Sequence, residues 1–137
     1  MLNCCGGPAR VGERLEEWEV YVTDEVRDWI SALDDRSHRL VVQAIDILAD
    51  RGPALGRPLV DHVEHSSVQN LKELRPGSAG RSELRILFVF DPWRSAVLLT
   101  AGDKSGNWRQ WYREAIPRAE ELLETYLKER GAEEGSA

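Results

Sequence analysis

The stretch that decides the fold reads NLKELRPGSAGRSELRILFVFDPWRSAVLLTAGDKSGNWRQWYREAIPR, from residue 70 to residue 118. Within it, apolar runs near residues 69–75, 82–91 and 95–101 alternate with short segments rich in turn residues. Such runs predict three strands joined by hairpin turns. Basic residues recur at the strand ends and in the loops, so the sequence places several cations near one edge of a sheet.

Upstream of this stretch, the sequence predicts one more strand and two helices. Residues 17–22 alternate acidic and apolar side chains, which indicates a first strand. Apolar residues then recur twice at helical spacing, and we expect Thr23 and Ser37 to cap the two helices and Gly52 to end the second. We interpret residues 52–69 as an irregular loop that returns to the sheet.

Downstream, Pro117 fits the first turn of a third helix, whose apolar side begins at Ala119. The order β-α-α-β-β-β-α predicts an α+β fold of two layers, with two N-terminal helices packed on a small, mostly antiparallel sheet. The C-terminal helix would partly close the other face. We expect one domain over residues 15–130, with disordered tails at residues 1–14 and 131–137.

The charge of the chain is unevenly distributed. The 137 residues carry a net charge of −6, which argues against a general nucleic-acid-binding protein. Between residues 71 and 118, however, nine Lys or Arg face five Asp or Glu, a local charge of +4 that leaves −10 for the rest. This asymmetry is typical of a basic working surface with acidic flanks. A solvated mixed surface is the alternative.

Several classes of protein are disfavoured by the sequence. Cys4 and Cys5 are adjacent and are the only two cysteines, so we expect neither a structural disulfide nor a cysteine-based zinc site. No run approaches the ~20 apolar residues of a membrane-spanning helix. The N-terminal residues lack the pattern of a signal peptide, and we therefore expect a cytoplasmic protein with no membrane partner.

Three cations are the first candidates for binding a phosphate group. Strand alternation places Arg75 on the same face of the strand as Glu73, and it places Lys72 on the opposite face. Arg85 lies opposite the most apolar set of its strand, which predicts that it faces the exposed side of the sheet, and Lys104 follows the last strand in a Gly-containing loop. Arginine binds phosphate through two parallel contacts, and lysine acts as a point charge.

The alternative interpretation of these arginines is structural. Arg75 and Arg85 each have a glutamate two residues upstream, Glu73 and Glu83. Residues two apart share a face of a strand, so each arginine could serve only to pair with its neighbour.

Aromatic residues follow the Lys104 loop and alternate with cations. Trp108, Trp111 and Tyr112 are interleaved with Arg109 and Arg113. Flat rings between cations can stack RNA bases and hold the backbone, and Trp108 with Arg109 is the best placed for this. The alternative is that these rings pack the final helix against the sheet.

The histidines give a weaker signal. His62 and His65 share a segment with Asp61 and Glu64, but this spacing fits no known zinc motif. A solvated loop is the better interpretation, and we expect no metal and no cofactor.

At this point the sequence resembles the phage-derived Gp49-like and HigB toxins, within the RelE/ParE superfamily of toxin–antitoxin modules. The resemblance covers roughly residues 18–127. It rests on five features that occur in order, namely LKELR at 71–75, LRILF at 84–88, LL at 98–99 with Lys104, WY at 111–112, and Ile116, Pro117 and Ala119.

The resemblance implies a RelE-like fold and an mRNA endoribonuclease that inhibits translation. Such toxins enter the ribosomal A site and cut mRNA there without a metal, by attack of the 2′-hydroxyl on the adjacent phosphate. It also implies a helix-turn-helix antitoxin as partner, through which the pair contacts operator DNA.

Carried over to this sequence, the resemblance makes Arg75, Arg85 and Lys104 the catalytic residues and adds Lys72 to the RNA-binding residues Trp108 and Arg109. Lys104 or Lys72 could act as base or acid. Two alternatives stay open. One is a non-enzymatic toxin like the ParE branch, and the other is a decayed toxin that acts only in a complex with antitoxin and DNA.

Overall fold

The computed structural model describes residues 17–77 and 80–136 of the chain. In this part the elements run in the order β1 (Glu19–Val22), α2 (Asp24–Ser31), α3 (Asp35–Arg51), the 3₁₀ turn η3 (Gly52–Ala54), β2 (Val60–His62), β3 (Lys72–Leu74), β4 (Leu84–Phe90), β5 (Ser95–Asp103) and α4 (Trp108–Ser136). The predicted tail at residues 1–14 lies outside the described residues.

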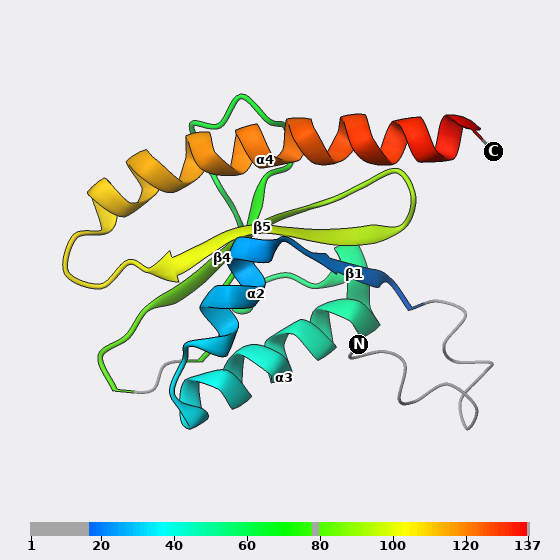
Figure 1. Cartoon of the computed structure of the whole chain (residues 1–137). Coiled ribbons are helices and arrows are strands. Elements are labelled where there is room, and N and C mark those ends of the chain that lie inside the picture. The colour runs from blue at the N-terminus through cyan, green and yellow to red at the C-terminus, as the bar shows by residue number, and fades with distance from the viewer. Residues whose placement is uncertain (1–16, 78–79, 137) are drawn as a thin grey trace, which may run out of the picture.

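The five strands form one sheet in the order β1-β5-β4-β3-β2. β1 runs parallel to β5, and the other neighbouring pairs are antiparallel. Figure 1 shows α3 on one side of this sheet and α4 along the other. The prediction of an α+β fold with a mostly antiparallel sheet, two N-terminal helices and a C-terminal helix is confirmed.

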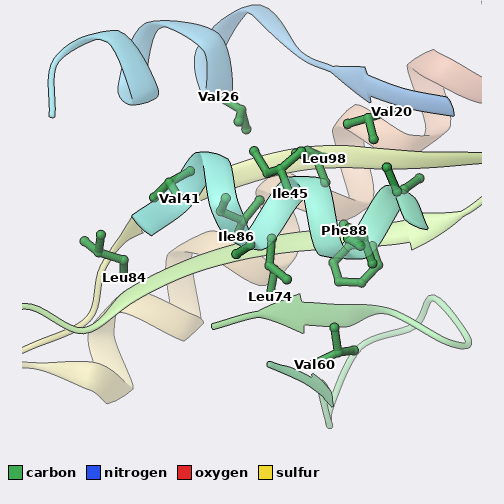
Figure 2. Packing of buried hydrophobic residues seen from close by; sticks show 14 residues of the cluster. Val20, Val26, Val41, Ile45, Val60, Leu74, Leu84, Ile86, Phe88 and Leu98 are labelled. Carbon is green, nitrogen blue, oxygen red and sulfur yellow. The ribbon is translucent and has the colours of Figure 1, made fainter. Parts of the chain in front are cut away.

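Each face of the sheet has its own apolar core. Ile86, Phe88 and Leu98 pack with the apolar sides of α2 and α3 (Figure 2). On the opposite face, Leu87 and Leu99 pack beneath α4. Because strand side chains alternate, both faces of β4 are apolar, as a central strand covered on two sides requires.

The ends of the first two helices follow local chemistry. Thr23 caps α2, where its side chain accepts a hydrogen bond from the N–H of Val26 at 3.3 Å. The cap predicted at Ser37 is wrong, because Asp34 is the N-cap of α3 and accepts from the N–H of Ser37 at 3.1 Å. Asp34 has an extended backbone and lies one residue before the helix, whereas Ser37 is buried and already inside the first helical turn. Gly52 ends α3 with a positive φ of 60°, as predicted.

The predicted irregular loop contains a strand that the sequence pattern missed. β2 pairs antiparallel with β3, with Val60 opposite Leu74 and His62 opposite Lys72. Three residues are too few to show an alternating pattern. The pairing edge of β3 therefore supplies the register, and the buried Val60 anchors the strand in the core.

The last helix is longer at both ends than predicted. It begins at Trp108, and the side chain of Asn107 accepts from the N–H of Gln110 at 3.3 Å, so Pro117 lies inside the helix and not in its first turn. The helix also continues to Ser136, past the predicted boundary at residue 130. An ion pair of 2.9 Å between Arg130 and Glu134, one turn apart, supports this continuation.

Candidate functional site

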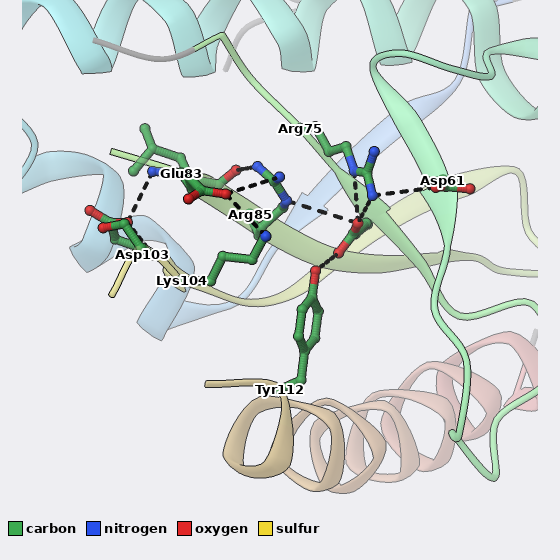
Figure 3. A network of polar contacts seen from close by, with 10 residues as sticks. Asp61, Arg75, Glu83, Arg85, Asp103, Lys104 and Tyr112 are labelled. Carbon is green, nitrogen blue, oxygen red and sulfur yellow. Dashed lines mark hydrogen bonds and ion pairs between the residues drawn. The ribbon is translucent and has the colours of Figure 1, made fainter. Parts of the chain in front are cut away.

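The three candidate cations lie in or directly after three neighbouring strands and form one row across the sheet. Leu74 is opposite Ile86, so Arg75, which follows β3, comes beside Arg85 of β4. Arg85 is opposite Gly102 of β5, and Lys104 follows two residues later. The structure therefore brings together the three residues predicted to be catalytic, on the face of the sheet that α4 covers (Figure 3).

A buried carboxylate, Glu73, joins the first part of this row. Only 2% of Glu73 is exposed. Arg75 donates to its carboxylate through Nε at 2.8 Å and contacts it through Nη2 at 2.7 Å. Tyr112 of α4 donates its hydroxyl to the other carboxylate oxygen, Oε1. Nε of Arg85 lies 3.9 Å from Oε2, the oxygen that Arg75 contacts. Glu73 therefore ties β3 to both β4 and α4.

A second carboxylate, Glu83, joins the other part of the row. Its Oε1 lies 3.1 Å from Nζ of Lys104 and 3.9 Å from Nη2 of Arg85. The backbone N–H of Glu83 donates to Asp103 at 3.0 Å. Asp103 also accepts from the N–H of Ser105 at 2.9 Å. These contacts fix the loop that carries Lys104 against the start of β4.

The cations are thus neutralised within the protein and do not form a bare cationic patch. Arg75 also contacts Asp61 at 3.3 Å. The ion pairs that the structural interpretation predicted, Arg75 with Glu73 and Arg85 with Glu83, are both present. The side chain of Arg85 is only 14% exposed and donates to the carbonyl of Leu84 at 2.8 Å. Arg85 is therefore largely covered, although we predicted that it faces the exposed side of the sheet.

The shifts in pKa agree with this network. Burial raises the pKa of Tyr112, and its hydrogen bond to Glu73 raises the pKa further, so the phenol keeps its proton at neutral pH. Burial lowers the pKa of Arg75, but the hydrogen bond and the charge of Glu73 outweigh this effect and raise it overall. Tyr112 is consequently a hydrogen-bond donor at this site and not a base.

A groove opens beside Arg75, between α4 and the chain that leaves β2. It has a volume of about 390 Å³. Glu73, Arg75 and Tyr112 line it from the sheet and helix side. His62 lines it from the end of β2, and His65 lines it from the segment after β2. A second groove of about 410 Å³ shares His65 and Tyr112 and continues along α4. Within the described residues, no three His, Cys, Asp or Glu side chains are placed to hold a metal ion together.

Trp108 lies where the two grooves meet. It lines both of them, and 53% of the residue is exposed. The guanidinium of Arg109 lies 5.0 Å from its ring centroid, and the ring of Tyr112 is 6.4 Å away. Trp111 follows the alternative interpretation, because it packs on the core beneath α4. Trp108 and Arg109 thus offer an open aromatic surface with a cation beside it.

Lys72 does not share this surface. Its strand neighbour Glu73 faces α4, and Lys72 points to the other side of the sheet, where its ammonium lies 5.7 Å from the centroid of the Phe90 ring. The alternation of the strand predicts this separation, so the structure does not bring Lys72 together with Trp108, and a role of Lys72 in RNA binding stays a prediction.

Sequence reasoning missed several residues of the groove. The sequence favours a solvated loop for the two histidines, because nothing in their spacing shows that β2 and α4 bring that segment beside Arg75. For Tyr112 the sequence indicates only base stacking or core packing. Its position four residues after Trp108 places both on one helical face, and this was the one available signal.

Comparisons with known proteins agree with the fold and the motifs. Residues 28–124 match the family described as Phage derived protein Gp49-like. The chain is 52% identical over 104 residues to HigB2 of Mycobacterium tuberculosis (strain ATCC 25618 / H37Rv), a candidate toxin. This match covers 76% of this chain and 52% of HigB2. It is 49% identical over 108 residues to HigB3 of the same strain, also a candidate toxin, covering 79% of this chain and 92% of HigB3. The chain therefore spans about half the length of HigB2 and nearly all of HigB3.

Two solved structures share the fold at low sequence identity. One is a mutant of the E. coli toxin RelE in the free state, with a TM-score of 0.55, 9% identity, and coverage of 74% of this chain and 97% of that one. The other is the archaeal RelE–RelB complex from Pyrococcus horikoshii, with a TM-score of 0.51 and 16% identity. This match covers 66% of this chain and 98% of the matched chain. No helix in the described part of the chain is long and apolar enough to cross a bilayer.

Proposed function

Because the chain belongs to the Gp49-like family of HigB toxins in the RelE/ParE superfamily, we propose that it is the toxin of a type II toxin–antitoxin system that cuts mRNA on the ribosome. The observation that carries the proposal is the row of Arg75, Arg85 and Lys104 beside a groove with an open tryptophan at its rim. The antitoxin, a helix-turn-helix protein that also contacts operator DNA, would hold the toxin inactive in the cytoplasm.

In this proposal the RNA backbone enters the groove and a base stacks on Trp108. Arg75 is the residue of the row that can meet a phosphate, because its side chain is 35% exposed and lines the groove. A phosphate oxygen would replace Asp61 as its outer partner, while Glu73 keeps the guanidinium in position from behind. Arg85 and Lys104 would stabilise the charge of the phosphate from behind Arg75, without contacting it directly, since both side chains are mostly buried.

The reaction forms a bond from the 2′-oxygen to phosphorus and breaks the bond from phosphorus to the 5′-oxygen of the next nucleotide. Negative charge grows on the phosphorane oxygens in the transition state, and a fixed guanidinium stabilises it. Proton transfer falls to His62 or His65, since imidazole can both accept and donate a proton at neutral pH and both residues line the groove. This differs from the assignment of a lysine base, because Lys104 is held by Glu83 and Lys72 is on the other face.

The test is cleavage by the purified protein on ribosomes that carry a defined mRNA, without added divalent metal beyond what the ribosome needs. We expect cuts that leave a 2′,3′-cyclic phosphate, and no cut when the nucleotide before the scissile bond is 2′-deoxy. Cutting of the deoxy-substituted mRNA at the same site, or intact mRNA throughout, contradicts the proposal.

A second candidate function is favoured by the ion pairs. Since every cation of the row already has a carboxylate partner, the chain could be a non-enzymatic toxin that poisons its target by binding, as in the ParE branch. Growth arrest with intact transcripts and with DNA-damage signalling would support this candidate over the nuclease.

A further inference from the structure

A third groove lies on the other side of α4, away from the proposed nuclease site. It has a volume of about 430 Å³ and opens between α2 and the C-terminal half of α4, beside β1. In Figure 1 these two helices are drawn in blue and in orange to red. β1 is an edge strand of the sheet, so the groove lies at the rim of the molecule.

The walls of this groove are acidic. Asp24, Glu25 and Asp28 line it from α2, and Glu129 lines it from α4. The one cation among its lining residues, Arg118, is already paired with Glu25 at 2.7 Å and with Glu121 at 2.7 Å.

Two of these carboxylates are available to a partner. Asp24 pairs with Arg27 at 2.9 Å. Asp28 and Glu129, in contrast, make no ion pair within residues 17–77 and 80–136, and both are exposed. Unpaired carboxylates on two facing walls repel one another, and a partner that brings cations between them relieves this repulsion.

The floor of the groove is apolar. Tyr21 is 44% exposed, which makes it one of the most exposed large apolar residues of the described chain. Its ring lies 4.7 Å from that of Tyr126, and Leu122 lines the groove beside it. An exposed aromatic residue surrounded by charge is typical of a protein interface, where a flat apolar centre is enclosed by a polar rim.

We infer that this groove docks a basic segment of the antitoxin, with an apolar side chain on Tyr21 and Leu122 and with Lys or Arg side chains against Asp28 and Glu129. Charge complementarity selects this occupant, since the chain outside residues 71–118 carries −10 and the groove lies mostly in that part. The identity of the partner rests on the proposed function. The docking groove lies on the opposite side of α4 from Trp108. The basic segment of the antitoxin would therefore bind the toxin without entering the proposed nuclease groove.

The experiment measures the affinity of the purified chain for the antitoxin encoded beside it in its native operon. The charge variant is Asp28→Lys/Glu129→Lys, and Tyr21→Ala removes the apolar anchor without a change of charge. The matched control is Asp46→Lys/Asp50→Lys on the exposed side of α3, which changes the net charge equally. Folding of each variant is checked by thermal unfolding.

We expect both groove variants to bind the antitoxin about tenfold to hundredfold more weakly. The control should bind within about twofold, and added salt should weaken the wild-type complex more than the charge variant. Each groove variant should still arrest growth, and co-expressed antitoxin should no longer neutralise it.

Equal loss of affinity in the control, or no loss in the groove variants, overturns the inference. So does a change of oligomeric state of the chain alone in the groove variants, which would assign the groove to a second copy. A failure of the proposed function appears differently, because the wild-type chain would then cut no mRNA whether or not the antitoxin binds this groove.

Discussion

At the scale of single residues, Glu73 decides the arrangement of the site. It is buried in a face that α4 covers, and it holds Arg75 and Tyr112 by hydrogen bonds while facing Arg85. A buried carboxylate is tolerated only when its partners satisfy it, and removing its charge leaves cations without a counter-charge. Glu73 is therefore a positioning residue for Arg75.

The variant Glu73→Gln keeps the volume of the side chain and removes its charge. We expect the free energy of unfolding to fall by about 3 kcal/mol, because Arg75 and the largely covered Arg85 lose the buried carboxylate that they share. The matched control is Glu83→Gln, whose side chain is 47% exposed and should cost no more than about 1 kcal/mol. Urea unfolding of both variants checks this, and equal losses would contradict the role of Glu73.

The tyrosines predict how stability depends on pH. Burial raises the pKa of Tyr112, and it raises the pKa of Tyr126 to about 12. Above pH ~10 the unfolded chain releases these protons while the folded chain retains them, so the folded state loses stability as the pH rises. The free energy of unfolding should fall between about pH 10 and pH 12 in the wild type, and less in Tyr112→Phe/Tyr126→Phe. The same slope in both proteins would contradict this account.

At the scale of elements, the sequence pattern predicted those parts whose periodicity is long enough to read. The helical spacing of α3 and the apolar runs of β4 and β5 are of this kind. β2 is not predicted from the sequence, because a strand of three residues takes its register from its neighbour β3. The start of α4 is predicted too late in the chain, because Pro117 suggests the first turn of a helix, whereas Asn107 caps the helix.

The junction between α3 and η3 carries the sharpest test at this scale. Gly52 has a positive φ of 60°, and a Cβ there would meet the indole of Trp18. We expect Gly52→Ala to lower the free energy of unfolding by more than about 1 kcal/mol, because both the backbone and the indole must shift. Gly56→Ala is the control, since nothing lies within 4 Å of its Cβ position. A difference between the two within the error of denaturant unfolding would refute this explanation.

At the scale of the whole molecule, α4 separates two surfaces of different chemistry. One side of the helix faces the groove of Arg75, Trp108 and the histidines, and the other faces the acidic groove of Asp28 and Glu129. The sequence predicted the asymmetry of charge and the convergence of the three cations. It could not show that Glu73 and Glu83 neutralise them, or that the segment after β2 forms a wall of the groove, because both depend on contacts between elements distant in the chain.

We propose that RNA meets this protein at Arg75, and this is tested by mapping transcript ends in cells that express the chain without the proposed antitoxin. Wild type and the control Arg27→Ala, which changes an exposed arginine of α2, should both produce new ends on translated mRNA. Arg75→Ala should fold and yield about 10²-fold fewer of these ends, as expected when one transition-state contact is lost. Undiminished cutting by Arg75→Ala would contradict the claim.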